Sequence, residues 1–275
     1  MDPFVTLDCL RDHRQEVVLA DVRFYLDGHA GTDGYAQGHI PGAVYIELRE
    51  VLADPDQDNS RGRHPLPSPE RFANGLAAAG IGEQDTVVAY DDAGGVMAAR
   101  LVWMLRVIGH DAALLDGGLQ AWPADELETG PPKPPRTDTK FTPTPWPQSR
   151  FVEIDDVASL DADTVLTDAR PFERYAGTPD GVDPRAGHIP GAVSLSARDN
   201  LAADGLLLPR QALTQRFAQA GLTPGRAFIS SCGSGVTACH NLLVHEQLGL
   251  GDAKLYVGSW SEWSRDPARP IATGS

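Results

Sequence analysis

The sequence predicts an α/β fold made of two tandem domains, each a parallel sheet flanked by helices. Two observations lead to this expectation. Residues 38–44 (GHIPGAV) recur letter for letter at residues 187–193, which indicates an internal duplication. Within each copy, short apolar runs alternate with segments of helical periodicity. That alternation is typical of strands joined by helical crossovers, which produce parallel sheets with helices on both faces.

Further landmarks recur in the same order in both copies. Upstream of the shared heptapeptide, LADVR at 19–23 matches LTDAR at 166–170. Downstream of it, GVMA at 95–98 matches GVTA at 235–238. Because chance matches would not keep this order, we place one domain at residues 1–128 and a second at residues 150–275.

Residues 129–149 separate the two copies and are rich in proline. Proline fixes φ and lacks the backbone N–H donor, so this stretch can form neither a helix nor a central strand. We expect an extended, semi-rigid linker that runs over the surface.

The elements of each copy follow from local patterns. Short apolar runs predict buried strands at residues 17–20, 86–90 and 112–115 of the first copy. Ser68 and Pro69 predict a helix start, as a cap residue and a proline at the first helical position, and Gly80 predicts its end. A second, apolar helix is expected over residues 95–108. The second copy repeats this pattern, with expected strands at 164–167, 227–230 and 254–257 and helices at 209–220 and 237–248.

The chain is strongly acidic. Its 275 residues include 38 Asp and Glu but only 23 Lys and Arg, which gives a formal net charge of −15. Binding to nucleic acid or to anionic lipid depends on clustered Lys and Arg. We therefore expect neither nucleic acid nor a membrane among the partners.

The cellular compartment is predicted from the apolar stretches, the N-terminal sequence and the cysteines. No apolar stretch approaches the roughly 20 residues that a membrane-spanning helix needs. The N-terminal sequence MDPFVTLDC lacks the basic and apolar parts of a secretory signal. The three cysteines form no disulfide framework, which favours a reducing compartment. We expect a cytoplasmic protein.

The most informative motif is the loop CGSGVTA at residues 232–238, between an expected strand and an expected helix. Ligands of parallel α/β sheets bind at such a junction. Two glycines allow successive backbone N–H groups to point at one atom, and the helix N-terminus adds partial positive charge. These surroundings favour the thiolate form of a cysteine. We therefore predict that Cys232 is a nucleophile within an active-site loop formed by Gly233, Ser234, Gly235, Val236, Thr237 and Ala238.

The alternative for any cysteine is a small buried apolar side chain, and for an isolated cysteine that is the commoner role. The flanking glycines and the strand–loop–helix context favour the nucleophile at Cys232. In the first copy, the matching loop has Asp92 at the nucleophile position, so only the second copy can perform cysteine chemistry. Cys239 and Cys9 lack this context, and we expect Cys239 to lie in the core.

With these motifs, the chain resembles the tandem-domain rhodanese family of sulfurtransferases, in which an inactive N-terminal copy precedes an active C-terminal one. The HIPGAV segments, the Asp-x-Arg strands and the CGSGVTA loop carry the resemblance over nearly the whole chain. The loop is similar to that of the 3-mercaptopyruvate branch. Thiosulfate-using members usually have arginine and lysine where this chain has Gly233 and Ser234. An uncharged loop fits a monocarboxylate bound by arginines elsewhere better than it fits the thiosulfate dianion.

The resemblance also implies where those arginines lie. Arg174 matches the family's substrate-binding arginine, and Arg185 falls near a second one, although the local spacing differs. The alternative for each is a solvated charge in a weak surface ion pair. Trp260 and Trp263 border the pocket in the family, and packing explains them equally well.

Several other polar residues have structural interpretations. Asp168 and Arg170 are expected to stabilise the strand end rather than to act in catalysis. His39 and His188 precede Ile-Pro-Gly-Ala in both copies, including the one without a cysteine. A role shared with the inactive copy is structural, so neither histidine is a candidate general base.

The chain departs from the mercaptopyruvate branch at one position. In that branch, an aspartate that follows the first HIPGA segment helps a loop serine to act on the cysteine. Here Arg49 stands at that place, and Glu47 lies two residues earlier. A relay through Ser234 therefore lacks its acid unless Glu47 replaces it.

The resemblance implies sulfur transfer by a ping-pong route. A Cys232 persulfide would carry sulfur from 3-mercaptopyruvate to cyanide, a small thiol or a thioredoxin-like protein. The alternatives are thiosulfate as the donor, or a persulfide carrier or sensor without rapid turnover. A cysteine phosphatase is disfavoured, because Thr237 and Ala238 stand where its phosphate-binding arginine is needed. No metal and no organic cofactor is expected, since no His/Cys cluster has ligand spacing and no Gly-x-Gly-x-x-Gly occurs.

Overall fold

The computed structural model describes residues 1–55 and 58–274. The chain forms two compact units. Unit 1 comprises Met1–Asp54, Leu66–Trp146 and Leu201–Leu207, and unit 2 comprises the described residues of Pro55–Pro65, Pro147–Asn200 and Leu208–Ser275.

The two units exchange short segments between the sequence copies. Residues 58–65 precede the proline-rich stretch but belong to unit 2, where the Arg63 backbone N–H donates to Ser261 Oγ at 3.1 Å. Residues 201–207 come from the second copy but belong to unit 1, where the Leu207 N–H donates to Asp116 Oδ1 at 2.7 Å. The division at residues 128 and 150 therefore describes the duplication, whereas the compact units cross it twice.

The proline-rich stretch packs on unit 1. Residues 129–147 contain neither helix nor strand. The Trp146 indole N–H donates to the Pro67 carbonyl at 2.7 Å, and the Phe141 ring lies 6.3 Å from that of Phe72. These contacts hold the stretch against helix α4 (Pro69–Ala78).

Unit 1 contains one parallel sheet of five strands in the order β1-β5-β4-β2-β3. Its strands and α-helices, in chain order, are β1 (Phe4–Val5), α1 (Leu7–Asp12), β2 (Val17–Asp21), α2 (Gly31–Gln37), β3 (Val44–Tyr45), α3 (Leu48–Val51), α4 (Pro69–Ala78), β4 (Thr86–Tyr90), α5 (Ala99–Val107) and β5 (Ala112–Leu115).

Unit 2 repeats this topology, with the parallel strand order β6-β10-β9-β7-β8. Its elements are β6 (Phe151–Val152), α6 (Ile154–Ala158), β7 (Thr164–Asp168), α7 (Phe172–Ala176), β8 (Val193–Ser194), α8 (Arg210–Gln219), β9 (Ala227–Ser231), α9 (Ala238–Leu248), β10 (Ala253–Tyr256) and α10 (Ser259–Trp263). The predicted α/β fold with two parallel sheets is confirmed.

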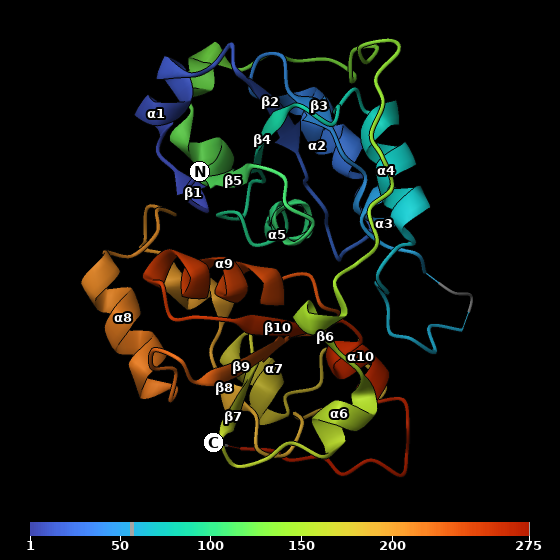
Figure 1. Cartoon of the computed structure of the whole chain (residues 1–275), viewed down its shortest axis with the longest axis vertical. Helices are drawn as coiled ribbons and strands as arrows, with labels where there is room; N and C mark the ends of the chain where they lie inside the picture. The colour runs from blue at the N-terminus through green and yellow to red at the C-terminus, as the bar shows by residue number, and fades with distance from the viewer. Residues whose placement is uncertain (56–57, 275) are drawn as a thin grey trace. The chain divides into compact units, whose positions relative to one another are not determined.

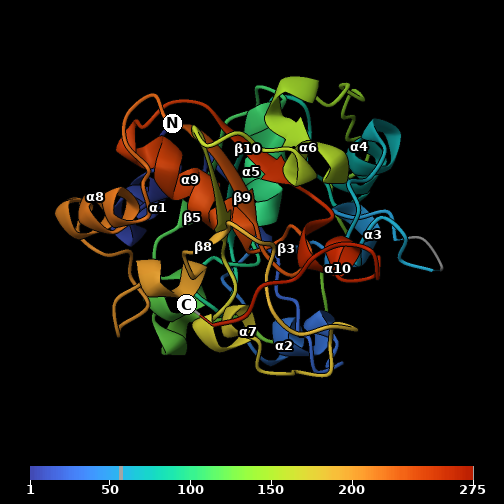
Figure 2. The ribbon, with the colours of Figure 1, turned by 90° about the horizontal axis from the view of Figure 1, so that it is seen from below.

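Helices cover both faces of the sheet in unit 2. On one face, residues of α6, α7 and α10 share a core cluster with strand residues, including Val157, Tyr175, Ile229 and Trp260. Helix α9 packs on β9 and β10, and α8 packs on α9. In both views the orange-red helix α9 lies beside β9 and β10 (Figures 1 and 2).

The strongest local signals in the sequence coincide with element ends. Ser68 caps α4 by accepting the Arg71 N–H at 3.1 Å, and Gly80 follows the helix with φ +82°. The expected strands at residues 86–90 and 112–115 agree with β4 and β5. The strands missed by the sequence pattern (β1, β3, β6 and β8) have two residues each, which is too short for any periodicity.

Nine of the eleven residues of helix α9 are buried, although several of them are polar. His240 and Asn241 are 0% exposed and His245 is 1% exposed. Asn200 donates to Asn241 Oδ1 at 2.7 Å, and Asn241 donates to the Leu195 carbonyl at 2.7 Å. These bonds satisfy buried amides that would otherwise destabilise the unit. Among residues 1–55 and 58–274, no helix combines the length and apolar character needed to cross a membrane.

The two histidines of α9 predict a loss of stability in mild acid. Burial lowers the pKa of His240 and of His245 to about 4. Below pH ~6.5 the unfolded chain binds protons that the folded chain does not, so stability falls as the pH drops towards 4. At pH 5 each histidine should lower the free energy of unfolding by about 2 kcal/mol relative to pH 7.5. Urea denaturation at both pH values measures this difference.

A pair of variants isolates the effect. In His240→Gln the difference in unfolding free energy between pH 7.5 and pH 5 should shrink by about the contribution of one histidine, ~2 kcal/mol. In His29→Gln, which removes an exposed histidine, the difference should match that of the wild type. An unchanged difference in His240→Gln would contradict the prediction.

Candidate active site

Cys232 lies at the carboxyl end of β9, the central strand of the sheet in unit 2. The strand ends at Ser231 and helix α9 begins at Ala238, so residues 232–237 form the connecting loop. The cysteine is 2% exposed. The structure thus places it at the junction where parallel α/β sheets bind ligands.

The first residues of helix α10 hold the Cys232 loop in place. The Ser259 hydroxyl accepts the Cys232 N–H at 3.1 Å and donates to the Tyr256 carbonyl at 2.8 Å. The N–H of Trp260 donates to the Cys232 carbonyl at 3.0 Å, and that of Ser261 to the Gly233 carbonyl at 2.8 Å. Ser259 has φ +52°, a conformation that is uncommon for a residue other than glycine. The backbone on both sides of the cysteine is therefore fixed.

The other two cysteines lie in different surroundings. Cys239 is 0% exposed, and its thiol lies 3.3 Å from the carbonyl of Gly235, which has φ +72°. This places Cys239 in the core, as the sequence predicts. Cys9 is exposed on α1, and none of the three cysteines forms a disulfide.

The equivalent of Cys232 in unit 1 is Asp91, and the assignment to Asp92 was wrong. Asp21 pairs with Tyr90, as Asp168 pairs with Ser231, so the next residues, Asp91 and Cys232, correspond. The alignment by the later Gly-Val pair fails because the first loop, residues 91–98, is longer than the second, residues 232–237.

The carboxylate of Asp91 occupies an anion site made of backbone amides. Asp91 Oδ1 accepts the N–H of Ala93 at 2.8 Å and of Gly95 at 2.7 Å. Asp91 Oδ2 accepts the N–H of Met97 at 2.7 Å and of Ala98 at 2.9 Å. Burial raises the pKa of this fully buried carboxyl, and the four amides act in the opposite direction. The loop of unit 1 therefore directs four backbone N–H donors at the two oxygens of one carboxyl group, which is the arrangement expected of the Cys232 loop.

Ser234 pairs with a residue that the sequence analysis did not single out. The Ser234 hydroxyl lies 2.8 Å from His64 Nδ1, and the two residues are 7% and 2% exposed. His64 belongs to segment 58–65, which packs in unit 2. A comparison of the two copies could have pointed to His64, because the corresponding stretch of the second copy, before α8, contains no histidine.

Glu47 and Arg49 are engaged within unit 1. Glu47 caps α3, since its carboxylate accepts the Arg49 N–H at 3.4 Å, and it also accepts the Tyr45 hydroxyl at 2.9 Å. The Arg49 guanidinium lies 5.4 Å from the centre of the Phe24 ring. These contacts give Glu47 a structural role.

Arg174 lies on α7 and faces the Cys232 loop. A Cβ atom added at Gly233 would lie 3.7 Å from Arg174 Nη2. Arg174 forms ion pairs with two aspartates of the following loop, through Nε with Asp180 and through Nη2 with Asp183 at 3.2 Å. The predicted substrate-binding arginine is therefore beside the candidate nucleophile.

Arg185 is placed differently. Its Nε donates to the Ser264 carbonyl at 2.7 Å and its Nη1 to the Arg269 carbonyl at 3.1 Å. Its Nη2 donates to the carbonyls of Trp263, at 3.2 Å, and Asp266. Because the guanidinium is used by four backbone acceptors, this geometry gives Arg185 a structural role instead of the substrate-binding role expected.

Arg63 is a second residue that sequence reasoning missed. A Cβ atom added at Gly233 would lie 3.0 Å from Arg63 Nη2. Arg63 Nη1 forms an ion pair with Asp183, the same aspartate that contacts Arg174. No local pattern marks Arg63, because it reaches the loop only through the packing of segment 58–65 in unit 2.

The Asp-x-Arg motifs form the same contacts in both units. Arg170 binds Asp168 at 2.6 Å and donates to the Gly187 carbonyl at 2.7 Å. Arg23 binds Asp21 at 2.6 Å and donates to the Gly38 carbonyl at 2.8 Å. Because the Asp–Arg ion pair is present in both units and only unit 2 has the loop cysteine, its role is to stabilise the fold.

The paired histidines and the tryptophans also make packing contacts. His39 stacks on Tyr35 and His188 on Tyr175, each with ring centres 3.7 Å apart. The indole N–H groups donate to backbone carbonyls, from Trp260 to Arg185 at 3.0 Å and from Trp263 to Pro270 at 2.9 Å. The Arg170 guanidinium lies 5.0 Å from the centre of the Trp260 ring.

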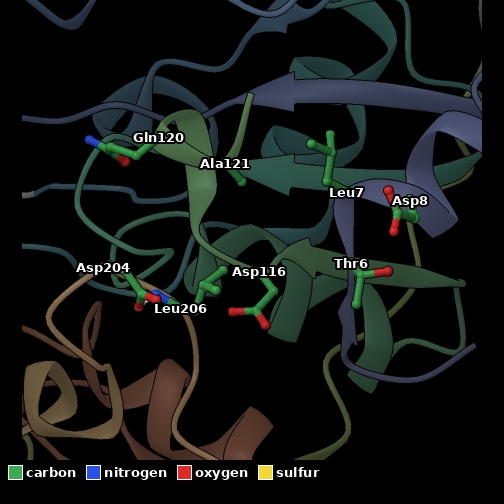
Figure 3. A pocket seen from close by; sticks show the side chains of 8 residues that line it. All are labelled: Thr6, Leu7, Asp8, Asp116, Gln120, Ala121, Asp204 and Leu206. Carbon is green, nitrogen blue, oxygen red and sulfur yellow. Dashed lines mark hydrogen bonds between the residues drawn. The ribbon is translucent and has the colours of Figure 1, made fainter. Parts of the chain in front are cut away.

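Unit 1 contains a cavity of about 440 Å³ beyond the carboxyl ends of β1 and β5. Figure 3 shows Asp8, Asp116 and Asp204 at its edge, with Leu7 and Leu206 among the apolar lining. Its lining has no cysteine, serine or histidine. In residues 1–55 and 58–274, no cluster of three or more His, Cys, Asp or Glu is arranged to hold a metal ion. The candidate nucleophile, Cys232, lies in unit 2 and not at this cavity.

Comparisons with known proteins agree with this fold. A family model described as a rhodanese-like domain matches twice, at residues 6–125 and 155–266. A Pseudomonas aeruginosa protein named "Probable 3-mercaptopyruvate sulfurtransferase" is 41% identical over 271 residues, covering 94% of this chain and 93% of the relative. A Mycobacterium tuberculosis relative, whose name refers to thiosulfate sulfurtransferase, is 37% identical over 262 residues, covering 94% and 92%.

A solved structure gives the same result. The 3-mercaptopyruvate sulfurtransferase from Leishmania major has a TM-score of 0.84 and 33% identity, and the match covers 98% of this chain and 76% of that one. The family model matches the chain twice, and the relatives align with it over nearly its full length. These matches define the class of protein. The chain belongs to the rhodanese family and contains two rhodanese-like domains.

Proposed function

We propose that this protein is a sulfurtransferase that carries sulfur as a persulfide on Cys232. The observation that supports this most strongly is the internal comparison of the two loops. In unit 1 the loop holds a carboxylate on four backbone N–H donors, and in unit 2 the same position is a cysteine. A loop built to stabilise an anion stabilises both a thiolate and the terminal sulfur of a persulfide.

The first half-reaction is attack by the Cys232 thiolate on the sulfur atom of 3-mercaptopyruvate. A sulfur–sulfur bond forms, the carbon–sulfur bond breaks, and its electron pair leaves as the enolate of pyruvate. The enolate takes up one proton to become pyruvate. The proton released by the donor's thiol balances that uptake, so the products are the persulfide anion and pyruvate.

Ser234 and His64 are positioned to move that proton. Their hydroxyl and ring nitrogen are 2.8 Å apart, and Ser234 is two residues from the nucleophile. A serine hydroxyl that is hydrogen-bonded to a histidine can give a proton to a reacting group and recover one from the imidazole. Glu47 does not supply a carboxylate to this relay, because its side chain caps α3.

The second half-reaction returns the enzyme to its starting state. An acceptor attacks the outer sulfur and leaves Cys232 as a thiolate, so cyanide yields thiocyanate. Thiols and a thioredoxin-like protein are the acceptors we propose in the cell. The three free cysteines fit a reducing, cytoplasmic location, which keeps the nucleophile unoxidised.

The donor is proposed to be 3-mercaptopyruvate, with thiosulfate as the alternative. The names of the relatives refer to both donors. The loop between Cys232 and Ala238 has no charged side chain, and the arginines beside it are paired with aspartates. This balance suits a single carboxylate better than the two charges of thiosulfate.

A donor comparison in the wild type and in Ser234→Ala tests the proposal. The wild type should show a higher kcat/KM for 3-mercaptopyruvate than for thiosulfate, with cyanide as the acceptor. Ser234→Ala should lose about 10- to 100-fold of kcat with mercaptopyruvate. It should lose much less with thiosulfate, because sulfite leaves without needing a proton.

Ser231→Ala is the matched control, because the Ser231 hydroxyl donates to the Thr167 carbonyl at 2.8 Å and takes no part in the relay. In Ser231→Ala the ratio of kcat with mercaptopyruvate to kcat with thiosulfate should equal that of the wild type. Equal losses with both donors in Ser234→Ala would reject the proton role. A persulfide that forms but is never turned over would instead indicate a carrier or sensor.

A further inference from the structure

One buried aspartate lies between two arginines of unit 2. Asp183 Oδ1 pairs with Arg63 Nη1, and Asp183 Oδ2 pairs with Arg174 Nη2 at 3.2 Å. The aspartate side chain is only 3% exposed, whereas the arginines are 18% and 20% exposed. Each oxygen of the carboxylate thus pairs with a different guanidinium, and both contacts join charged groups, which makes them stronger than neutral hydrogen bonds.

The same two arginines lie beside the candidate nucleophile. Arg63 Nη2 and Arg174 Nη2 would be 3.0 Å and 3.7 Å from a Cβ atom on Gly233. Gly233 has no side chain, so both guanidinium groups approach the backbone next to Cys232. An anionic small molecule whose sulfur reaches Cys232 must therefore come close to both positive groups.

Asp183 lies in the part of a loop that precedes the anchored Arg185. Residues 177–184 contain neither helix nor strand. Gly177 and Gly181 within this part both have positive φ. Such a loop can change conformation without unfolding a helix or strand.

We propose that Arg63 and Arg174 together bind the carboxylate of the sulfur donor, and that Asp183 occupies their binding position when no donor is present. The donor then replaces one carboxylate with another, so the charge at the arginine pair is unchanged. Arg63 takes the place that Arg185 was expected to fill. The inference rests on the proposed function only for the identity of the donor.

The test is the alkylation of Cys232 by iodoacetate and by iodoacetamide. The two reagents are similar in size, but only iodoacetate carries a carboxylate. Because both react with the same thiolate, the ratio of their rate constants cancels changes in thiolate reactivity. The Cys232 peptide is followed by mass spectrometry, so that alkylation of the exposed Cys9 does not interfere.

The variants should move this ratio in opposite directions. Arg63→Gln should lower the iodoacetate-to-iodoacetamide ratio by about tenfold or more. Asp183→Asn should raise it, because Arg63 and Arg174 Nη2 lose their carboxylate partner, although Arg174 Nε keeps its ion pair with Asp180. Arg269→Gln should leave it unchanged, although Arg269 is also 18% exposed and also pairs with an aspartate, Asp155. Arg63→Lys, which keeps the charge but not the paired donors, should give an intermediate ratio.

Turnover separates the failure of this inference from failure of the proposed function. In Arg63→Gln the KM for mercaptopyruvate should rise about as much as the alkylation ratio falls, with a smaller change in kcat. A ratio unaffected by Arg63→Gln, or lowered by Asp183→Asn, would overturn the inference. The alkylation ratios could change as predicted while neither the wild type nor any variant transfers sulfur. In that case the proposed function is wrong, but the assignment of Arg63 and Arg174 as a carboxylate-binding pair is supported.

Discussion

Replacing Cys232 by serine should abolish sulfur transfer from every donor, with a fall in kcat/KM of at least about 10⁴-fold. A serine hydroxyl is not ionised at neutral pH and cannot form a persulfide. The protein should remain folded, because the exchange removes little volume from a site held by the backbone bonds of Ser259, Trp260 and Ser261. Activity with both donors and a urea denaturation curve measure the two expectations.

Cys239→Ser is the control for this result. Cys239 is the second buried cysteine of unit 2, but it lies on α9 with its thiol against the Gly235 carbonyl. Its variant should keep most of the activity. A folded but inactive Cys239→Ser protein, together with an active Cys232→Ser protein, would show that the nucleophile is assigned to the wrong residue.

Replacing Asp91 by alanine should destabilise unit 1 by about 4 kcal/mol or more. The carboxylate of Asp91 accepts four backbone N–H groups and is fully buried. Alanine leaves these donors without an acceptor, and each unpaired buried donor costs about 1–3 kcal/mol, although such losses do not add fully. The midpoint of urea unfolding measures the change.

Asp92→Ala is the matched control, because it removes a neighbouring carboxylate that accepts a single bond, from the Tyr25 hydroxyl at 2.6 Å. We expect a loss of about 1 kcal/mol for that variant. Similar losses for the two variants would mean that the amides of the first loop do not form an anion site. The main argument for the chemistry of the second loop would then be lost.

The fold could be predicted because its determinants are local or repeated. The duplicated heptapeptide and the short β-branched runs are visible in the sequence without any knowledge of distant contacts. Cys232 could be predicted for the same reason, since its glycines and its strand and helix neighbours are adjacent in the chain. The two-residue edge strands were missed because they are too short to show a pattern.

The rest of the site depends on packing between distant segments. Arg63 and His64 reach the Cys232 loop only because residues 58–65 belong to unit 2, and no local sequence pattern predicts that placement. Arg185 was expected to bind substrate because its spacing resembles a family motif. Spacing cannot show that four backbone carbonyls already use its guanidinium. Similarly, only strand register distinguishes Asp91 from Asp92.

The central claim is that Cys232 accepts a sulfur atom from the donor. The most direct measurement is the intact mass of the protein after incubation with 3-mercaptopyruvate and no acceptor, followed by peptide mapping. We predict the addition of one sulfur atom, located on the Cys232 peptide, and its loss on addition of cyanide. An unchanged mass in the wild type, or the same added mass in Cys232→Ser, would contradict the account.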